Sequence, residues 1–154
     1  MSAIAAEPVV FSTVAEGARK AFGPRLTPEL YAKLRAVKFD LENVQAAYPL
    51  GDFVRAMGVL CDALVPNCPP LEQHRLLARE FMAGYRQTAI GFALFTLGRT
   101  IGVKRSLLRM GRNLRTTGNY LEADVTEDGP KSVRVVTRVL NEFRAKITPP
   151  RSSR

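Results

Sequence analysis

The hydrophobic spacing of this chain changes once, and that change decides its fold class. Up to about Leu114 the apolar residues recur every three or four positions, as they do on one face of an α-helix. From Tyr120 to Val125, and again from Val133 to Val139, the pattern is the two-residue alternation of a β-strand. The turn-forming residues 127–130 lie between the two alternating segments. The sequence therefore predicts an α+β fold in which a helical part is followed by a C-terminal β-hairpin.

Proline and glycine divide the helical part into segments. Gly23-Pro24 is expected to end the first helix, with Gly23 in the left-handed cap conformation, and Thr27-Pro28 is typical of the start of a second helix. We expect a short strand at residues 9–11 and helices at about 12–22, 27–37, 49–65, 71–88, 89–101 and 103–114. The segment 89–101 is apolar nearly all round, which predicts a place at the centre of the domain.

The hairpin needs a partner, because an isolated two-stranded hairpin is only marginally stable in water. It can pack on the helices, pair with the strand at residues 9–11, or pair with a second chain to give a homodimer through the hairpin edge. We predict one globular domain over residues 9–147, with about five or six helices packed against a small antiparallel sheet built around the hairpin. Residues 1–8 are expected to be flexible, and residues 148–154 to form a disordered basic tail.

Positive charge is concentrated in the last third of the chain. Residues 1–98 contain ten Lys/Arg and nine Asp/Glu, whereas residues 99–154 contain thirteen Lys/Arg and five Asp/Glu. A surface of one sign is therefore expected in the last third, and such a surface attracts phosphate groups or acidic partners.

Within the segment 103–114, Arg105, Arg109 and Arg112 recur at helical spacing and form a basic stripe. The guanidinium group is a planar fork that suits phosphate and carboxylate groups. The stripe is therefore a candidate contact surface for an anionic partner. The alternative is a solvated face, or ion pairs with acidic residues of neighbouring helices.

Two polar segments are further candidate contact points. In residues 112–120, Arg112 and Arg115 could donate to an anion and Tyr120 could provide a stacking wall; the structural alternative is a turn set by Gly118-Asn119. Residues 85–88 interrupt an apolar stretch; the structural alternative is a helix bend in which Thr88 bonds back to a carbonyl and Tyr85 reaches a polar partner. The candidate contact residues are Arg105, Arg109, Arg112, Asn113, Arg115, Asn119, Tyr120, Tyr85, Arg86 and Thr88.

The sequence contains no recognisable catalytic, metal-binding or cofactor-binding motif. His74 is the only histidine and is expected at the surface, and Cys61 and Cys68 are expected to be free thiols. One imidazole and two distant thiols do not supply a metal site, and no glycine-rich phosphate loop or nucleophile elbow occurs. We therefore expect a non-enzymatic protein without a metal or cofactor.

The sequence also favours a cytoplasmic location. The N-terminus lacks the basic start, apolar stretch and small-residue cleavage site of a secretory signal. The most apolar run, residues 89–97, is too short to span a bilayer. Free cysteines agree with a reducing compartment.

Four segments, namely residues 11–17, 23–28, 84–88 and 109–120, carry a family resemblance that covers about residues 9–140. Together they resemble a large paralogous family of uncharacterised proteins restricted to myxobacteria, which share a domain of unknown function. The resemblance implies a cytoplasmic protein of unassigned activity. Members of that family continue past the hairpin with a further helix and strand, whereas this chain stops at Arg154; this shortened C-terminus is expected to leave a hairpin edge uncovered and to favour a dimer.

The layout of helices followed by a twisted hairpin is also similar to the ligand-binding fold shared by haem–nitric-oxide sensors and vesicle-tethering subunits. This similarity is one of layout only, and His74 does not match a haem ligand. Our leading hypothesis is a non-enzymatic regulatory module that senses a small-molecule ligand or binds a protein partner. The alternative is a nucleic-acid-binding protein that uses the basic last third.

Overall fold

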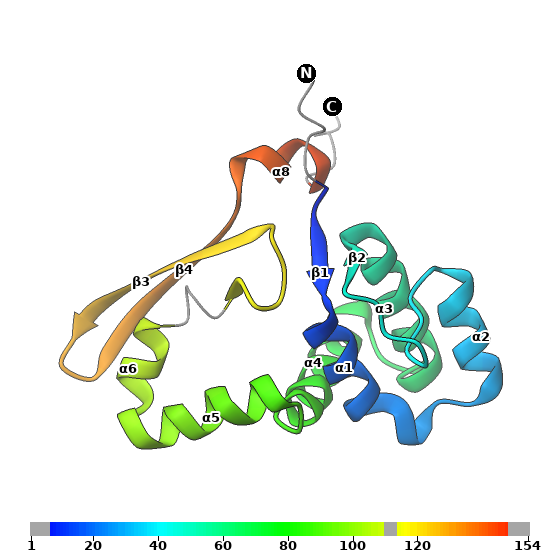
Figure 1. The fold of residues 1–154 in the computed structure, drawn as a ribbon, viewed down its shortest axis with the longest axis horizontal. Helices are drawn as coiled ribbons and strands as arrows, with labels where there is room; N and C mark the ends of the chain where they lie inside the picture. Colours follow the sequence, from blue (N-terminus) through cyan, green and yellow to red (C-terminus); the bar gives the residue numbers. More distant parts are fainter. Residues whose placement is uncertain (1–6, 110–113, 148–154) are drawn as a thin grey trace.

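The computed structural model describes residues 7–109 and 114–147 and has the predicted α+β fold (Figure 1). Within these ranges, seven α-helices and a short 3-10 turn accompany two separate two-stranded antiparallel sheets. The predicted basic tail and most of the predicted flexible N-terminus lie outside the described residues. The elements are β1 (Val9–Phe11), α1 (Ser12–Phe22), η1 (Gly23–Arg25), α2 (Pro28–Ala36), β2 (Ala47–Pro49), α3 (Leu50–Leu64), α4 (Pro70–Tyr85), α5 (Ala89–Ile101), α6 (Val103–Leu108), β3 (Leu121–Gly129), β4 (Ser132–Val139) and α8 (Asn141–Ile147).

Helices α1 to α4 and the β1–β2 sheet form the body of the molecule (Figure 1). Helix α1 packs against α4, and α3 packs against α2 and α4. The helical spacing of apolar residues predicted this core, because Leu30 and Leu34 of α2, Leu60 and Cys61 of α3, and Leu77 of α4 are all buried.

The start of α2 agrees with the sequence prediction, whereas the end of α1 does not. Thr27 caps α2, and its hydroxyl accepts a hydrogen bond from Leu30 N–H at 3.3 Å. The predicted left-handed cap at Gly23 is wrong, because Gly23 has φ −45° and its N–H donates to Arg19 O. Pro24 has a φ fixed near helical values, so the chain turns onward through η1 instead of stopping at a left-handed residue.

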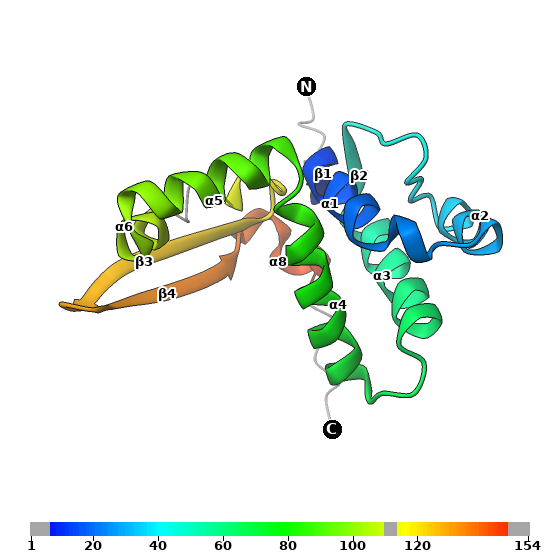
Figure 2. The ribbon, with the colours of Figure 1, turned by 90° about the horizontal axis from the view of Figure 1, so that it is seen from below.

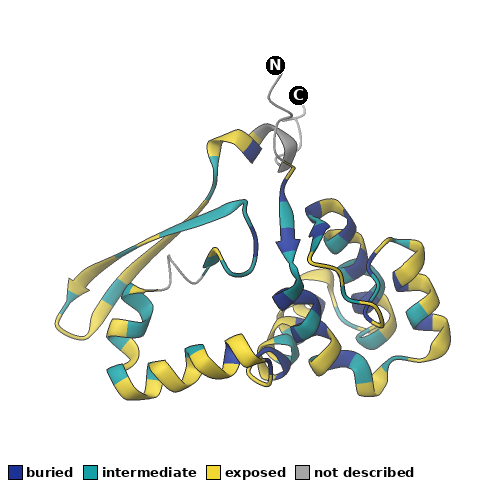
Figure 3. Ribbon diagram, in the orientation of Figure 1, coloured by how far each residue is buried: buried dark blue, intermediate teal, exposed yellow. Residues whose placement is uncertain are grey.

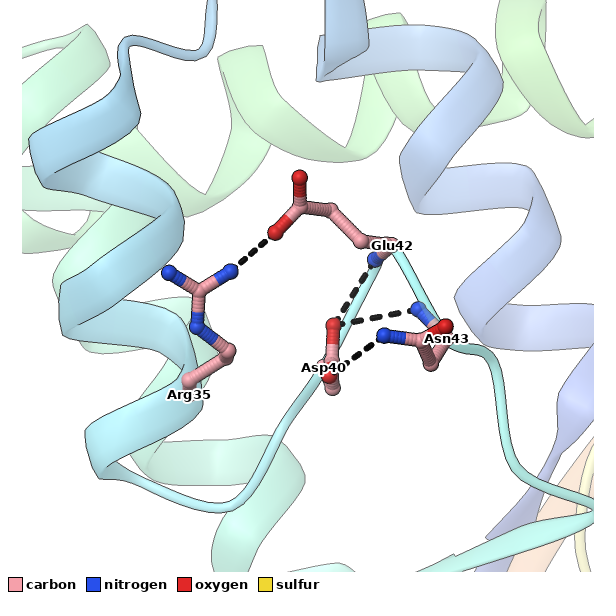
Figure 4. A network of polar contacts seen from close by, with 4 residues as sticks. All are labelled: Arg35, Asp40, Glu42 and Asn43. Atoms are coloured by element: carbon pink, nitrogen blue, oxygen red, sulfur yellow. Dashed lines mark hydrogen bonds and ion pairs between the residues drawn. The ribbon is translucent and has the colours of Figure 1, made fainter.

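Strand β2 was not predicted, and it pairs antiparallel with β1. The loop before β2 is held by two side chains. The Tyr48 hydroxyl donates to Asp40 O at 2.7 Å and accepts from Gln45 N–H at 2.8 Å. One carboxylate oxygen of Asp40 accepts the N–H groups of Glu42 and Asn43 (Figure 4). Burial alone would raise the pKa of the Asp40 carboxyl, but the hydrogen bonds from Asn43 and Glu42 lower it below its ordinary value.

Helix α5 lies outside the core, so its predicted central position is wrong. Gly91 is its only buried residue, whereas Phe92 is 66% exposed. Most of the helix is exposed (Figure 3). Helix α4 ends at Tyr85, earlier than predicted, and Thr88 begins α5 in a direction that leads away from the body (Figure 1). All-round apolarity indicates that a helix must be covered, but it does not say which element covers it. None of the described helices is long and apolar enough to cross a bilayer.

Helices α5 and α6 form an arm together with the hairpin, and α6 contacts both β3 and β4 (Figure 2). Helix α6 ends at Leu108, before the predicted end at Leu114. The strands pair from Leu121 opposite Val139 to Gly129 opposite Ser132, with an irregularity between Glu127 and Gly129. This irregularity carries β3 through the predicted turn at residues 127–130, so the chain reverses later, at residues 130–131.

Helix α8 follows the hairpin and was not predicted. The Leu140 N–H donates to Tyr120 O at 3.0 Å where β4 ends. Phe143, in the first turn of α8, is 1% exposed. The end of the described chain therefore contributes a buried aromatic side chain.

Candidate functional site

The predicted corner at residues 112–120 is largely structural where it is described. The Asn119 side chain accepts from Val9 N–H at 2.8 Å and donates to Glu7 O at 3.0 Å. Phe11 N–H donates to Thr117 O at 2.9 Å, and Val10 forms a β-bridge with Gly118. Residues 117–119 therefore line the second edge of β1, opposite β2. This agrees with the turn interpretation of Gly118-Asn119, and the amide of Asn119 is already used by the backbone.

The polar segment at residues 85–88 is the joint between α4 and α5. The Thr88 hydroxyl donates to Tyr85 O at 2.7 Å and accepts from Gly91 N–H at 3.0 Å, so it caps α5. Arg86 lies over the Phe95 ring at 4.9 Å. The prediction that Tyr85 reaches a polar partner is wrong, because its buried hydroxyl has no hydrogen-bond partner in the described part of the chain. The structural interpretation of Thr88 is confirmed.

The basic residues of the last third fall into two groups. On the hairpin, Arg134 pairs with Asp128 at 3.4 Å, and Arg138 pairs with Glu122 at 3.2 Å and also with Asp124. By contrast, Arg105, Arg109 and Arg115 are exposed and have no ion pair within residues 7–109 and 114–147. Arg112 and Asn113 lie outside the described residues, so the full stripe is not seen.

An apolar cleft of about 450 Å³ lies among α1, α3 and α4. Apolar residues of α3 and α4 that recur at helical spacing line it together with residues of α1, and Tyr120 lines it as well. His74 and Ala78 are exposed, so they mark the opening of the cleft to solvent, whereas Phe22 and Leu77 are buried. The lining residues are Val10, Val14, Phe22, Phe53, Met57, Cys61, His74, Leu77, Ala78, Phe81, Thr117 and Tyr120.

Hydrogen bonding or burial acts on three of the polar side chains that line the cleft. The His74 Nδ1 lies 2.7 Å from Pro70 O; a carbonyl only accepts, so Nδ1 is the donor in this hydrogen bond. Burial raises the pKa of the Tyr120 phenol, which stays a hydrogen-bond donor at neutral pH. Burial, with Asp62 nearby, raises the pKa of the Cys61 thiol, so Cys61 is a poor nucleophile and a small apolar wall group.

A larger hollow of about 570 Å³ lies beside Tyr48 and is lined by charged residues, including Arg35, Lys38 and Asp52. Its Asp40 carboxylate and Tyr48 hydroxyl already hold the loop before β2. We therefore regard this hollow as part of the loop's support and the apolar cleft as the candidate site. In the described ranges, no group of three or more His, Cys, Asp and Glu side chains could hold a metal ion.

Of the residues that line the cleft, only Tyr120 was predicted to be a contact residue. Phe53, Met57, Leu77 and Phe81 belong to the apolar residues that recur at helical spacing, which is typical of a buried face. Spacing cannot distinguish a filled core from a hollow one, because that depends on how closely the helices approach.

The fold and the cleft define an α+β protein with a helical body, an apolar cleft and a helix–hairpin arm. Residues 9–143 match the family model described as "Protein of unknown function (DUF2378)", and the chain belongs to this family. No curated protein and no solved structure showed a significant match to the chain.

Proposed function

We propose that this protein is a non-enzymatic sensory module that binds a small, largely apolar ligand in the cleft among α1, α3 and α4. The observation that supports this proposal is the cleft itself, with a volume of about 450 Å³ and mostly aliphatic and aromatic walls. Ligand sites of proteins typically enclose about 300–1,000 Å³ and combine apolar walls with a few polar groups. The cleft has both properties.

The polar groups narrow the chemistry of the ligand. The cleft offers the imidazole of His74 at its opening and the phenol donor of Tyr120 in one wall. An apolar chain or ring with one hydroxyl or carboxyl group would bury its hydrocarbon against Met57 and Phe81 and place its polar end at His74. We therefore expect medium-chain fatty acids or alcohols to be suitable first probes.

The position of Tyr120 gives the cleft a connection to the arm. Tyr120 lines the cleft and immediately precedes β3, and Thr117, another lining residue, belongs to the segment that borders β1. A ligand that displaces the Tyr120 ring would bias the position of the hairpin, because Tyr120 O also accepts from Leu140 N–H at the end of β4. Ligand binding in the cleft would thus change the position of the arm, which a partner bound to the arm could detect.

A tryptophan reporter tests ligand binding directly. The chain contains no tryptophan, so Phe53→Trp places a single indole in the cleft wall. We expect a saturable change in its emission as a medium-chain fatty acid or alcohol is added. The additional substitution Ala78→Phe, which fills the opening, should abolish that change, whereas Val54→Ser on an exposed part of α3 should not. An emission that stays constant for every chain length would contradict the proposal.

We also propose that the hairpin edge pairs with a second copy of the chain. The β3–β4 sheet has two strands only, and no further described strand pairs with its outer edges. Exposed edges of this kind are commonly covered by another strand. Sedimentation velocity should show a concentration-dependent dimer, and a monomer at every protein concentration would refute this pairing.

The nucleic-acid alternative has weaker support. Arg105, Arg109 and Arg115 are exposed and could contact phosphates, but Arg134 and Arg138 are engaged by acidic residues of the hairpin. A cytoplasmic location and a distribution restricted to myxobacteria remain predictions. Fractionation of the source cell and a survey of genomes would test them.

A further inference from the structure

Helix α5 exposes four large apolar side chains to solvent. Phe92 is 66% exposed, Leu97 40%, Phe95 39% and Ile90 38%. The 92 and 95 positions lie on one flank of the helix, and the 90 and 97 positions lie on the other. Exposed apolar side chains therefore stand on two sides of α5, and most of the helix is exposed (Figure 3). Contiguous surfaces of this kind mark interaction sites.

Some polar groups of this surface are satisfied within the helix, and others stand near its ends. The Thr100 hydroxyl donates to Leu97 O at 2.9 Å, within the helix itself. It can therefore enter an apolar medium without leaving an orphan donor. Arg86, which follows α4, lies over the Phe95 ring of α5, and Arg99 stands near the end of α5. Long cationic side chains at such positions can keep their charge in water while the helix is buried.

The charge around α5 has one sign. Residues 81–121 contain seven Arg and Lys residues and no Asp or Glu. Of these, Arg99, Arg105 and Arg109 are exposed and form no ion pair in the described structure. Lys104 is engaged by the hairpin, at 3.0 Å from the Glu127 carboxylate. The surface that contains α5 and α6 is thus both apolar and cationic.

We propose that the α5–α6 surface, defined by residues 89–109, docks into the interfacial region of a membrane that contains anionic lipids. Helices that lie in this interface combine aromatic and aliphatic residues with Arg or Lys, and anionic headgroups strengthen their binding. A protein groove takes up one narrow strip of a helix, whereas the apolar residues of α5 occupy two flanks, which suits a fluid apolar medium. A second copy would bring two cationic surfaces together, which opposes self-association there.

Vesicle co-sedimentation of the full chain tests the proposal. We expect binding to vesicles of phosphatidylcholine mixed with phosphatidylglycerol, and much weaker binding to phosphatidylcholine alone. The double variant Phe92→Ser/Leu97→Ser should lower the affinity about tenfold or more, because two apolar side chains no longer enter the interface. The double variant Arg99→Gln/Arg105→Gln should weaken binding to the anionic vesicles only. Val54→Ser removes an apolar side chain that is 59% exposed on α3, and should bind like the unmodified protein.

Because Phe92 and Leu97 are exposed, their replacement should leave the far-ultraviolet circular dichroism and the unfolding midpoint unchanged, which checks that the variant is folded. Three results would overturn the proposal. One is the absence of binding to the anionic vesicles. Another is a gel shift of duplex DNA or RNA that Arg99→Gln/Arg105→Gln abolishes while vesicles are not bound. The third is a dimer that Phe92→Ser/Leu97→Ser dissociates while vesicles are not bound.

Discussion

The crossing of α1 and α4 can be tested with a single methyl group. A Cβ atom at Gly84 of α4 would lie 2.3 Å from the backbone nitrogen of Ala21 in α1 and 2.5 Å from its Cα. The prediction is therefore that Gly84→Ala destabilises the protein, although the same substitution stabilises an ordinary helix. The test bears on the candidate site, because α1 and α4 form two walls of the apolar cleft.

The magnitude follows from two opposing effects. Alanine in place of glycine in a helix interior stabilises the folded state by about 1 kcal/mol. Ordinary contacts begin at 3.4 Å, so the new methyl group overlaps a backbone atom by roughly 1 Å, and backbone cannot rotate away as a side chain can. Overpacking costs about 1–3 kcal/mol, and we take the upper end for a backbone clash. The net loss at Gly84→Ala is then about 2 kcal/mol.

Gly58→Ala is the matched control, because Gly58 also lies inside a helix and a Cβ there meets nothing within 4 Å. It should stabilise the protein by about 1 kcal/mol. Urea unfolding followed by far-ultraviolet circular dichroism gives both free energies of unfolding, and the two variants should differ by about 3 kcal/mol. Two variants of equal stability would show that α1 and α4 do not cross at Gly84.

Three further predictions concern hydrogen bonds. Asn119→Ala should lower the free energy of unfolding by about 1–3 kcal/mol and speed hydrogen exchange at the Val9 amide; unchanged exchange would argue against this anchor. Thr88→Ala removes the α5 cap and should cost about 1 kcal/mol with a loss of helical dichroism; full retention of both would contradict the capping role. The pKa of Asp40 is lowered in the folded protein, so its stabilising effect should be complete above the unfolded value of 3.8 and disappear as the pH falls below it. The stability difference between the unmodified chain and Asp40→Asn should shrink from pH 6 towards acid, and a difference that does not vary with pH would refute this.

Local signals in the sequence located most helices and the hairpin. Thr27 and Pro49 marked helix starts because capping and the fixed φ of proline act within one turn of the chain. The alternation from Tyr120 to Val139 predicted paired strands because the two-residue period is a local property. Only the position of the turn was wrong, since a strand irregularity shifts the register without changing the alternation.

Features that depend on distant contacts could not be predicted in the same way. Strand β2 is three residues long and exists through its pairing with β1. The apolar sequence of α5 indicated a helix that another element covers, but it did not show that the helix lies outside the core. Asn119 was identified as a candidate contact residue, and its anchoring role became evident only when the structure placed it beside Val9, 110 residues away. The cleft likewise arises from how helices pack, which spacing along one helix does not encode.

The double tethering of β1 has a consequence for how the molecule assembles. One edge of this strand pairs with β2. The other edge pairs with residues 117–119, which are synthesised much later than β1. The first strand to emerge is thus among the last to be completed, and loop closure over such a separation is slow. A nascent chain that ended before Asn119 would present an open strand edge with the Val9 amide unpaired. The contact between β1 and residues 117–119 would form only after helices α5 and α6 had been synthesised.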